Sequence, residues 1–251
     1  MNELNNPLAK APIVEAVVDI DVEMRPGFAL SETRGKLAAA FADRYPVVRD
    51  REFEAHQFHK IPGSAGSVKS ESGLESLMFL QVDEKQLVQA RRRGFSFNRL
   101  APYEGFDHYR TEIKTRWKQF CEVIAPVRVT SVKMRFINRI EIALDDGQVD
   151  LDQYLTVGPR APDEDAFGFA GFSSRSVMFE KATGVQVILS LASRPSTVDA
   201  IAIIMDIEAA IQCDCDPLDV DAIFERLEIV RLTKNLAFRK SLEEKCRALF
   251  N

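Results

Sequence analysis

The strongest constraint on the fold is a strict alternation of apolar and charged residues in two long segments. In the first, from Pro12 to Met24, apolar residues occupy the even positions. The carboxylates occupy odd positions, namely Glu15, Asp19, Asp21 and Glu23. In the second, after Pro126, an apolar face lies opposite Lys133, Arg135, Arg139 and Glu141. A period of two is typical of a β-strand with one buried face, so the sequence predicts one strand with an acidic face and one with a largely basic face.

A broad apolar stripe predicts a long helix after Pro102. Its apolar residues recur at steps of three and four: Phe106, Tyr109, Ile113, Trp117, Phe120 and Ile124. A stripe of this width marks an amphipathic helix that covers a core.

The other segments extend this order of elements. A short helix precedes Pro46, and strands are expected at 51–61, 74–82 and 86–99, with Gly94 as a bulge in the third. Further strands are expected at 167–181, 185–193 and 200–211. Residues 217–250 have a helical pattern that slips near Lys234 and Asn235, where we expect a kink.

Runs of neighbouring strands with helices between them predict an α+β fold with antiparallel sheets and segregated helices. The order strand, helix, three strands, helix occurs twice, which suggests two tandem halves at 1–126 and 127–251, the second with a long C-terminal helix. The alternative is one continuous domain.

Composition and motif content exclude several classes of function. A net charge of -5 argues against a nucleic-acid partner, because such proteins rely on a positive field. No apolar stretch is long enough to cross a membrane, and the N-terminus lacks the pattern of a secretory signal. Four cysteines are too few for a disulfide framework, so we expect a cytoplasmic protein. Common hydrolase, zinc-protease, dinucleotide and P-loop motifs do not occur in the sequence.

Three small clusters could carry chemistry, and each has a simpler interpretation. His56 and His59 fall on opposite faces of a predicted strand, so they cannot share a metal. Cys213 and Cys215 lack two further ligands for zinc, and we predict neither a metal nor a cofactor. The run 91–93 of three arginines, followed by two phenylalanines, could contact nucleic acid, but a solvated ribbon is the favoured interpretation.

The segment 135–142 is the most informative in the chain. Alternation places Asn138 on the apolar face, where its amide needs hydrogen-bond partners. Arg135 and Arg139 point the other way. They could pair with the carboxylates of the strand at 12–24, which is the interpretation we favour. Alternatively, they could grip a carboxylate or phosphate, with Asn138 orienting a buried network.

Several segments resemble a sporadically distributed bacterial family of unknown function. The resemblance rests on 12–17 (PIVEAV), 95–103 (FSFNRLAPY), 135–142 (RFINRIEI) and 205–208 (MDIE). Glu208 and Phe106 depart from the family pattern, which has Asp and often Trp at these places. The family has no established activity, and its patchy occurrence resembles that of defence and toxin–antitoxin loci.

These observations lead to two functional hypotheses. The first is a non-enzymatic accessory protein that binds a protein partner or itself, linked to bacterial defence. The second is a module with a groove between sheet and helix that binds an anionic small molecule or a nucleotide. Enzymatic activity stays undecided, because acid–base pairs from distant residues leave no spacing to read. The candidate ligand or partner residues are Tyr103, Arg135, Asn138, Arg139, Glu141, Asp206 and Glu208.

Overall fold

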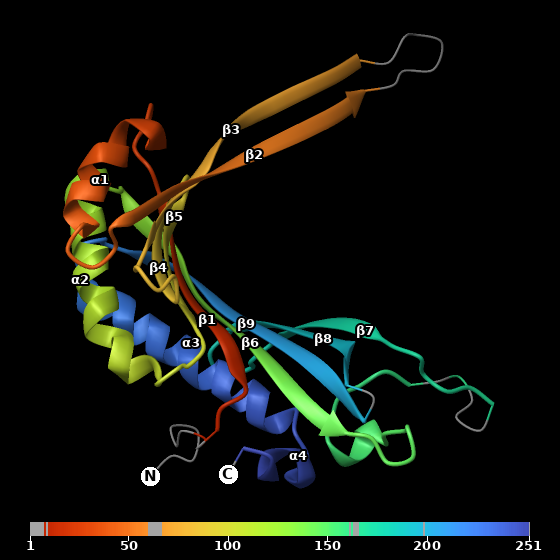
Figure 1. Cartoon of the computed structure of the whole chain (residues 1–251). Coiled ribbons are helices and arrows are strands. Elements are labelled where there is room, and N and C mark those ends of the chain that lie inside the picture. Colours follow the sequence, from red (N-terminus) through yellow and green to blue (C-terminus); the bar gives the residue numbers. More distant parts are fainter. Residues whose placement is uncertain are drawn as a thin grey trace.

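The computed structural model describes residues 8, 10–59, 67–160, 162, 166–197 and 199–250. Within these residues the chain forms a single antiparallel sheet of nine strands in the order β2-β3-β4-β5-β1-β6-β9-β8-β7 (Figure 1). The strands are β1 (Ile13–Glu23), β2 (Val47–His59), β3 (Ser67–Leu80), β4 (Gln86–Arg91), β5 (Gly94–Leu100), β6 (Arg128–Ala143), β7 (Ser173–Phe179), β8 (Gln186–Thr197) and β9 (Ala200–Cys215). The helices are α1 (Arg34–Phe41), α2 (Phe106–Ile124), α3 (Val220–Lys240) and α4 (Glu244–Ala248), with short 3-10 segments at Leu30–Thr33 and Leu151–Gln153. The α+β class with an antiparallel sheet is confirmed.

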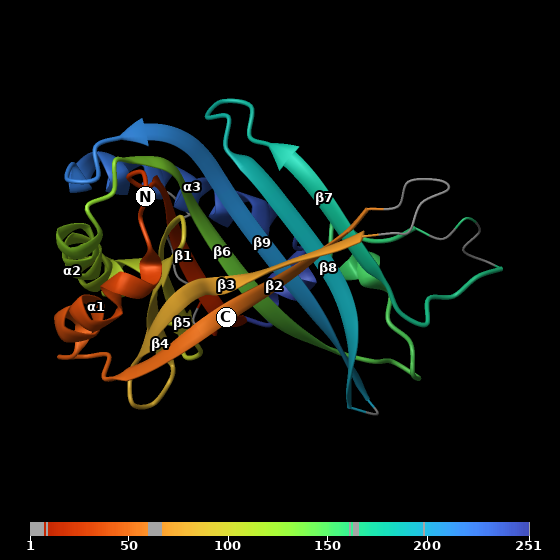
Figure 2. The same ribbon diagram turned by 90° about the horizontal axis from the view of Figure 1, so that it is seen from above.

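The sheet has one covered face and one open face. Helices α1, α2 and α3 lie along the same side of the sheet, whereas the β2–β3 hairpin and β7–β8 extend away from them (Figures 1 and 2). The core lies between the sheet and these helices, and its largest fully buried side chain is Trp117 of α2. None of the helices in the described ranges is both long and apolar enough to span a membrane.

The two alternating segments form the centre of the sheet. Strand β1 pairs antiparallel with β6, and residues of even number face the helices from Ala16 onwards on β1 and from Val132 onwards on β6, after a register irregularity near Ser131. This arrangement follows from the alternation, because a one-residue shift in register would expose the apolar side chains. Where β1 and β6 meet, Lys133 forms an ion pair with Asp21 at 2.6 Å.

The expected third strand of the first half, at 86–99, is instead a hairpin. β4 ends at Arg91 and β5 begins at Gly94, so the expected bulge at Gly94 is wrong. A Cβ on Gly94 would collide with the backbone of Ile20 and lie 3.0 Å from the Cα of Asp21. The glycine is therefore required because β1 passes close to the turn.

The expected kink near Lys234 and Asn235 is also wrong. Helix α3 runs unbroken from Val220 to Lys240, and the chain leaves the helix only at Ser241 before α4 begins. The apolar stripe slips at Lys234 because this residue faces a cavity, and its buried side chain does not interrupt the helix.

Candidate functional site

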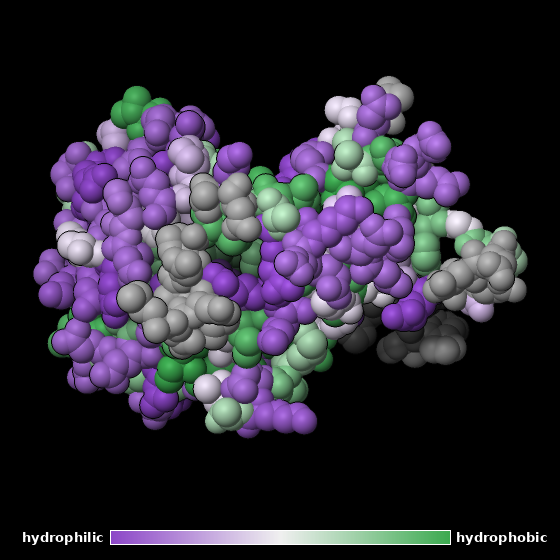
Figure 3. Space-filling model, turned by 90° about the horizontal axis from the view of Figure 1, so that it is seen from below, coloured by the Kyte–Doolittle hydropathy of each residue, from purple (hydrophilic) through white to green (hydrophobic). Residues whose placement is uncertain are grey.

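A cavity of about 550 Å³ lies between the sheet and α3. Its walls come from the covered face of β6 and β9, from α3, from the connection 103–107 that leads into α2, and from the N-terminal segment around Pro12. The face that carries the chain termini is largely hydrophilic and is hollowed near its centre, where hydrophobic residues are visible (Figure 3). A cavity of this size is within the range that holds a small organic ligand.

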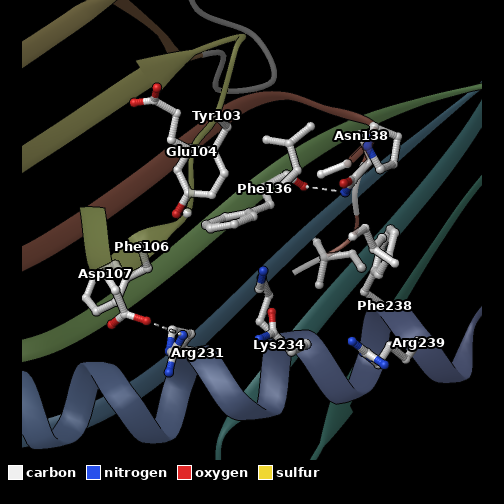
Figure 4. A pocket seen from close by; sticks show the side chains of 17 residues that line it. Tyr103, Glu104, Phe106, Asp107, Phe136, Asn138, Arg231, Lys234, Phe238 and Arg239 are labelled. Atoms are coloured by element: carbon white, nitrogen blue, oxygen red, sulfur yellow. Dashed lines mark hydrogen bonds and ion pairs between the residues drawn. The ribbon is translucent and has the colours of Figure 1, made fainter. Parts of the chain in front are cut away.

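Lys234 is the most unusual residue of this cavity. Its side chain points from α3 towards β6 (Figure 4), and the residue is only 6% exposed. The Nζ atom lies 3.4 Å from the centroid of the Phe136 ring. No carboxylate among the described residues forms an ion pair with it. A lysine is almost never buried to this extent without a partner.

Two opposing effects act on the protonation of Lys234. Burial, together with the nearby positive charge of Arg231, lowers the pKa of the amine to about 7. The ring of Phe136 favours the charged form through a cation–π interaction, which contributes only about 0.5–2 kcal/mol. Burial is the larger effect because an ammonium group without a counter-ion loses its hydration. The amine is therefore partly neutral near pH 7.

Arg231 lies one turn before Lys234 on α3 and is already committed to carboxylates. It donates to Glu228 at 2.9 and 2.5 Å, and its Nη1 atom lies 3.5 Å from a carboxylate oxygen of Asp107 at the start of α2 (Figure 4). Arg231 thus fixes α3 to the N-terminal end of α2 and adds positive charge beside Lys234.

Tyr103 and Asn138, both singled out from the sequence, line the same cavity. The Tyr103 ring packs against Phe136 with centroids 5.2 Å apart, and burial raises the pKa of its phenol, so the hydroxyl stays protonated. The Asn138 amide nitrogen donates to the carbonyl oxygens of Met205 at 3.0 Å and Phe136 at 3.3 Å. This leaves the amide oxygen as an acceptor at the cavity wall.

The other candidate residues lie on the open face of the sheet. Arg135 makes a bidentate contact with Asp206 of β9, with its shortest distance 2.6 Å, and this contact raises the pKa of Arg135. Glu208 is the cross-strand neighbour of Arg135. Arg139 donates to Glu141 at 2.6 Å. The sheet therefore separates these five residues from Tyr103 and Asn138.

The ion pairs of the open face differ in part from the favoured expectation. β1 is the neighbour of β6, as expected, and its carboxylates contact Lys133 and Arg128. The partners of Arg135 and Arg139 come instead from β9 and from β6 itself. Both guanidinium groups are engaged by carboxylates and do not form a shared grip for an anion.

The structure shows the surroundings of the arginine run and of the two cysteines that the sequence analysis considered. Arg91 contacts Asp19 and Asp21, and Arg92 lies 4.6 Å from the centroid of the Phe53 ring. Cys213 and Cys215 are free thiols at the end of β9. No group of three potential metal ligands occurs among the described residues. His59 is one of the residues whose side chains lie outside the description.

Sequence reasoning missed Lys234, Arg231 and Asp107. The signal for Lys234 was the interruption of the apolar stripe of α3. A polar residue on the inner face of an amphipathic helix indicates either that the helix breaks there or that the residue faces a cavity. The chain matches no known family model and no curated protein in the two comparisons made.

Proposed function

We propose that the chain is a ligand-binding module that holds a small organic molecule with an anionic group in the cavity beside Lys234. The observation that carries this proposal is a buried amine, at the wall of a cavity of about 550 Å³, for which the described part of the chain supplies no carboxylate partner. Burying an unpaired ammonium group costs several kcal/mol. A bound anion offsets that cost by supplying the missing counter-charge.

The rest of the lining supports a ligand with a flat or apolar body. Tyr103, Phe106, Phe136 and Phe238 contribute aromatic surface, and Asn138 contributes a polar anchor. Three basic residues, Arg231, Lys234 and Arg239, face two acidic ones, Glu104 and Asp107. Arg231 is matched by Glu228 and Asp107, whereas no carboxylate among the described residues pairs with Lys234, so the balance of charge beside Lys234 favours an anion.

The binding test compares two lysines on opposite faces of the sheet. Protein purified from its host is analysed by native mass spectrometry for a retained ligand, and thermal unfolding is measured with a panel of nucleotides, carboxylic acids and sugar phosphates. A ligand at 100 times its Kd stabilises a protein by about 2.7 kcal/mol. We expect stabilisation in the wild type and in Lys133→Met, and loss of it in Lys234→Met. Equal stabilisation of all three proteins, or of none by any anion, contradicts the proposal.

A second candidate function, self-association, is favoured by the edge strand β7. It is the last strand of the sheet, and Val177, Met178 and Phe179 are exposed on it. An edge with unpaired backbone groups and apolar side chains can pair with the same strand of a second copy. Light scattering should show a dimer for the wild type and for Phe167→Lys, and a monomer for Phe179→Lys. A monomeric wild type contradicts this candidate.

The two halves of the chain are proposed as tandem relatives. In each half the first strand lies beside the last strand of its own meander, β1 beside β5 and β6 beside β9, which supports the proposal. The first half has one more strand in its meander than the second. On the β1 side, the space under α2 is filled by Trp117, Phe120 and Phe95, whose ring centroids lie 5.4–5.7 Å apart. Under this proposal, the binding cavity lies where the two halves meet, because its walls come from Pro12 and 103–107 of the first half and from β6, β9 and α3 of the second.

A further inference from the structure

The surroundings of Lys234 favour the reactive form of its side chain. A lysine is nucleophilic only as the neutral amine, and its pKa falls when it is desolvated or placed beside another cation. Lys234 meets both conditions, because it is buried and because Arg231 lies one helical turn away. The described part of the chain supplies no carboxylate partner that would hold the proton on Nζ.

The geometry also gives the amine a protected position beside the cavity. The face of the Phe136 ring covers one side of Nζ at 3.4 Å from the ring centroid, and Lys234 itself lines the cavity. A reactant therefore reaches the amine from the cavity and not from bulk solvent. Apolar walls limit the water that would hydrolyse a product formed there.

We propose that Lys234 binds its ligand covalently, as an imine with the carbonyl group of an aldehyde or ketone that also carries a carboxylate or phosphate group. This inference rests on the proposed binding function and names the ligand class for the same cavity. The nitrogen lone pair adds to the carbonyl carbon, and proton transfer from nitrogen to oxygen gives a carbinolamine. The carbon–oxygen bond then breaks, the oxygen leaves as water with the second proton of the amine, and a carbon–nitrogen double bond forms. No oxidant or reductant is consumed.

The groups that face Lys234 suit such a ligand. The α3 wall of the cavity carries Arg231 and Arg239 beside Lys234, whereas Glu104 and Asp107 line the cavity near the start of α2, where Asp107 contacts Arg231. The protonated hydroxyl of Tyr103 and the amide of Asn138 provide hydrogen-bonding groups in the same cavity. An uncharged aldehyde lacks the carboxylate or phosphate group that the basic residues of α3 would attract.

The experiment traps the imine by reduction. The full chain is incubated with glyoxylate or pyridoxal 5′-phosphate and sodium cyanoborohydride at pH 7, with propionaldehyde as an uncharged probe, and modified lysines are identified by peptide mass mapping. At pH 7 about half of an amine of pKa 7 is neutral, compared with about one part in a thousand or less for an ordinary lysine. We expect Lys234 to be modified at least about ten times faster than the exposed Lys240 of the same helix, and faster by the anionic probes than by propionaldehyde.

Two variants separate this inference from the binding function on which it rests. Lys234→Arg keeps a positive charge and cannot form an imine, so it should lose trapping at position 234 while anions still raise its unfolding temperature. Lys234→Met should lose both effects. Trapping in the wild type that is no faster at Lys234 than at Lys240 overturns the covalent proposal without needing any variant to fold. Anion stabilisation without trapping then leaves the binding function intact, whereas loss of both refutes both.

Discussion

The basic side chains on the two faces of β6 have different surroundings. On the open face, Lys133 and Arg135 each contact a carboxylate of a neighbouring strand, and the Arg135 and Asp206 side chains are 45% and 22% exposed. On the covered face, Lys234 reaches β6 from α3, is nearly inaccessible, and contacts an aromatic ring and not an acid. The charges of the open face are neutralised by their neighbours, whereas the described residues supply no carboxylate partner for Lys234 on the covered face.

This contrast shows that the density of charged residues is a poor guide to a binding site. Half-exposed ion pairs form at little cost and contribute at most about 1 kcal/mol, so a sheet can carry many of them without any function. A buried amine without a counter-ion lowers the stability of the fold. Such a residue is therefore a better candidate for a binding role than a paired charge on the surface. Substitutions on the two faces of β6 should therefore differ in their effects on stability and on anion binding.

The largest effect is expected at Phe136, which separates the core from the cavity. Phe136→Ala should lower the free energy of unfolding by about 3–5 kcal/mol, because it removes a buried ring and the surface on which Lys234 packs. Ile137→Ala, one residue along the strand on the open face, should cost about 1 kcal/mol or less. Urea denaturation of both variants measures the difference. Equal losses would mean that the two faces of β6 are packed alike, which would remove the basis of the comparison.

The next effect is a gain of stability in Lys234→Met that depends on pH. The pKa of Lys234 is about 7 in the folded chain, against 10.5 for an ordinary lysine. Between these values the unfolded chain binds more protons, so the stability contributed by this site rises with pH and is lowest at pH 7 and below. Lys234→Met should therefore be more stable than the wild type by about 2–4 kcal/mol at pH 6.5, and the gain should shrink towards pH 10.

The control for this prediction is Lys133→Met on the open face, which should lose stability at pH 7 because it breaks the contact with Asp21. Arg231, Asp107, Glu104 and Tyr103 face the cavity in the wild type and in both variants, so the difference between the proteins isolates the substituted lysine. Thermal unfolding over pH 6–10 gives the curves. A gain for Lys234→Met that does not change with pH would contradict the titration of Lys234 in this range.

Local sequence patterns could predict the elements but not the charge pairs. β1, β6 and α2 each bury one face, so their periodicity alone located them within a few residues. The partner of Arg135 is 71 residues away on β9, and nothing around Arg135 specifies it. The pairing depends on strand order, which alternation does not encode.

The candidate site was predicted in part for the same reason. Asn138 could be found because an amide on the apolar face of a strand is anomalous within that strand alone. Lys234 interrupts the apolar stripe of α3, but from the sequence alone a kink in the helix accounts for this interruption equally well. The three-dimensional structure distinguishes them, because α3 is continuous from Val220 to Lys240 and Lys234 lines the cavity between α3 and β6.

A smaller effect than that of Lys234 is expected for Asp21→Asn, at the centre of the open face. The Asp21 carboxylate accepts from Arg91 at 2.8 Å, from Ser131 at 2.8 Å and from Lys133 at 2.6 Å. Burial alone would raise its pKa, but these contacts together lower the pKa below 3.8, the value of an ordinary aspartate. The resulting stability is present above about pH 4 and is lost as the pH falls through the lowered pKa of the folded state.

The Asp21→Asn variant should thus be less stable than the wild type by about 1–3 kcal/mol at pH 7. The difference should narrow at pH 3 and below, where the wild-type carboxylate begins to take up a proton. Urea unfolding at the two pH values tests this. A difference that persists unchanged at low pH would show that Asp21 acts through its shape and not through its charge.

The smallest effect is expected for the Arg135–Asp206 pair, and it tests whether the open face is as nearly neutral in energy as its geometry indicates. In a double-mutant cycle with Arg135→Met and Asp206→Asn, the coupling energy should be about 1 kcal/mol or less and should fall as salt is raised from 0.05 to about 0.5 M, because both side chains reach solvent. Neither variant should alter anion-dependent stabilisation through Lys234. A coupling of several kcal/mol, or loss of anion binding in Arg135→Met, would move the functional site to the open face and reverse the assignment of the two sides of β6.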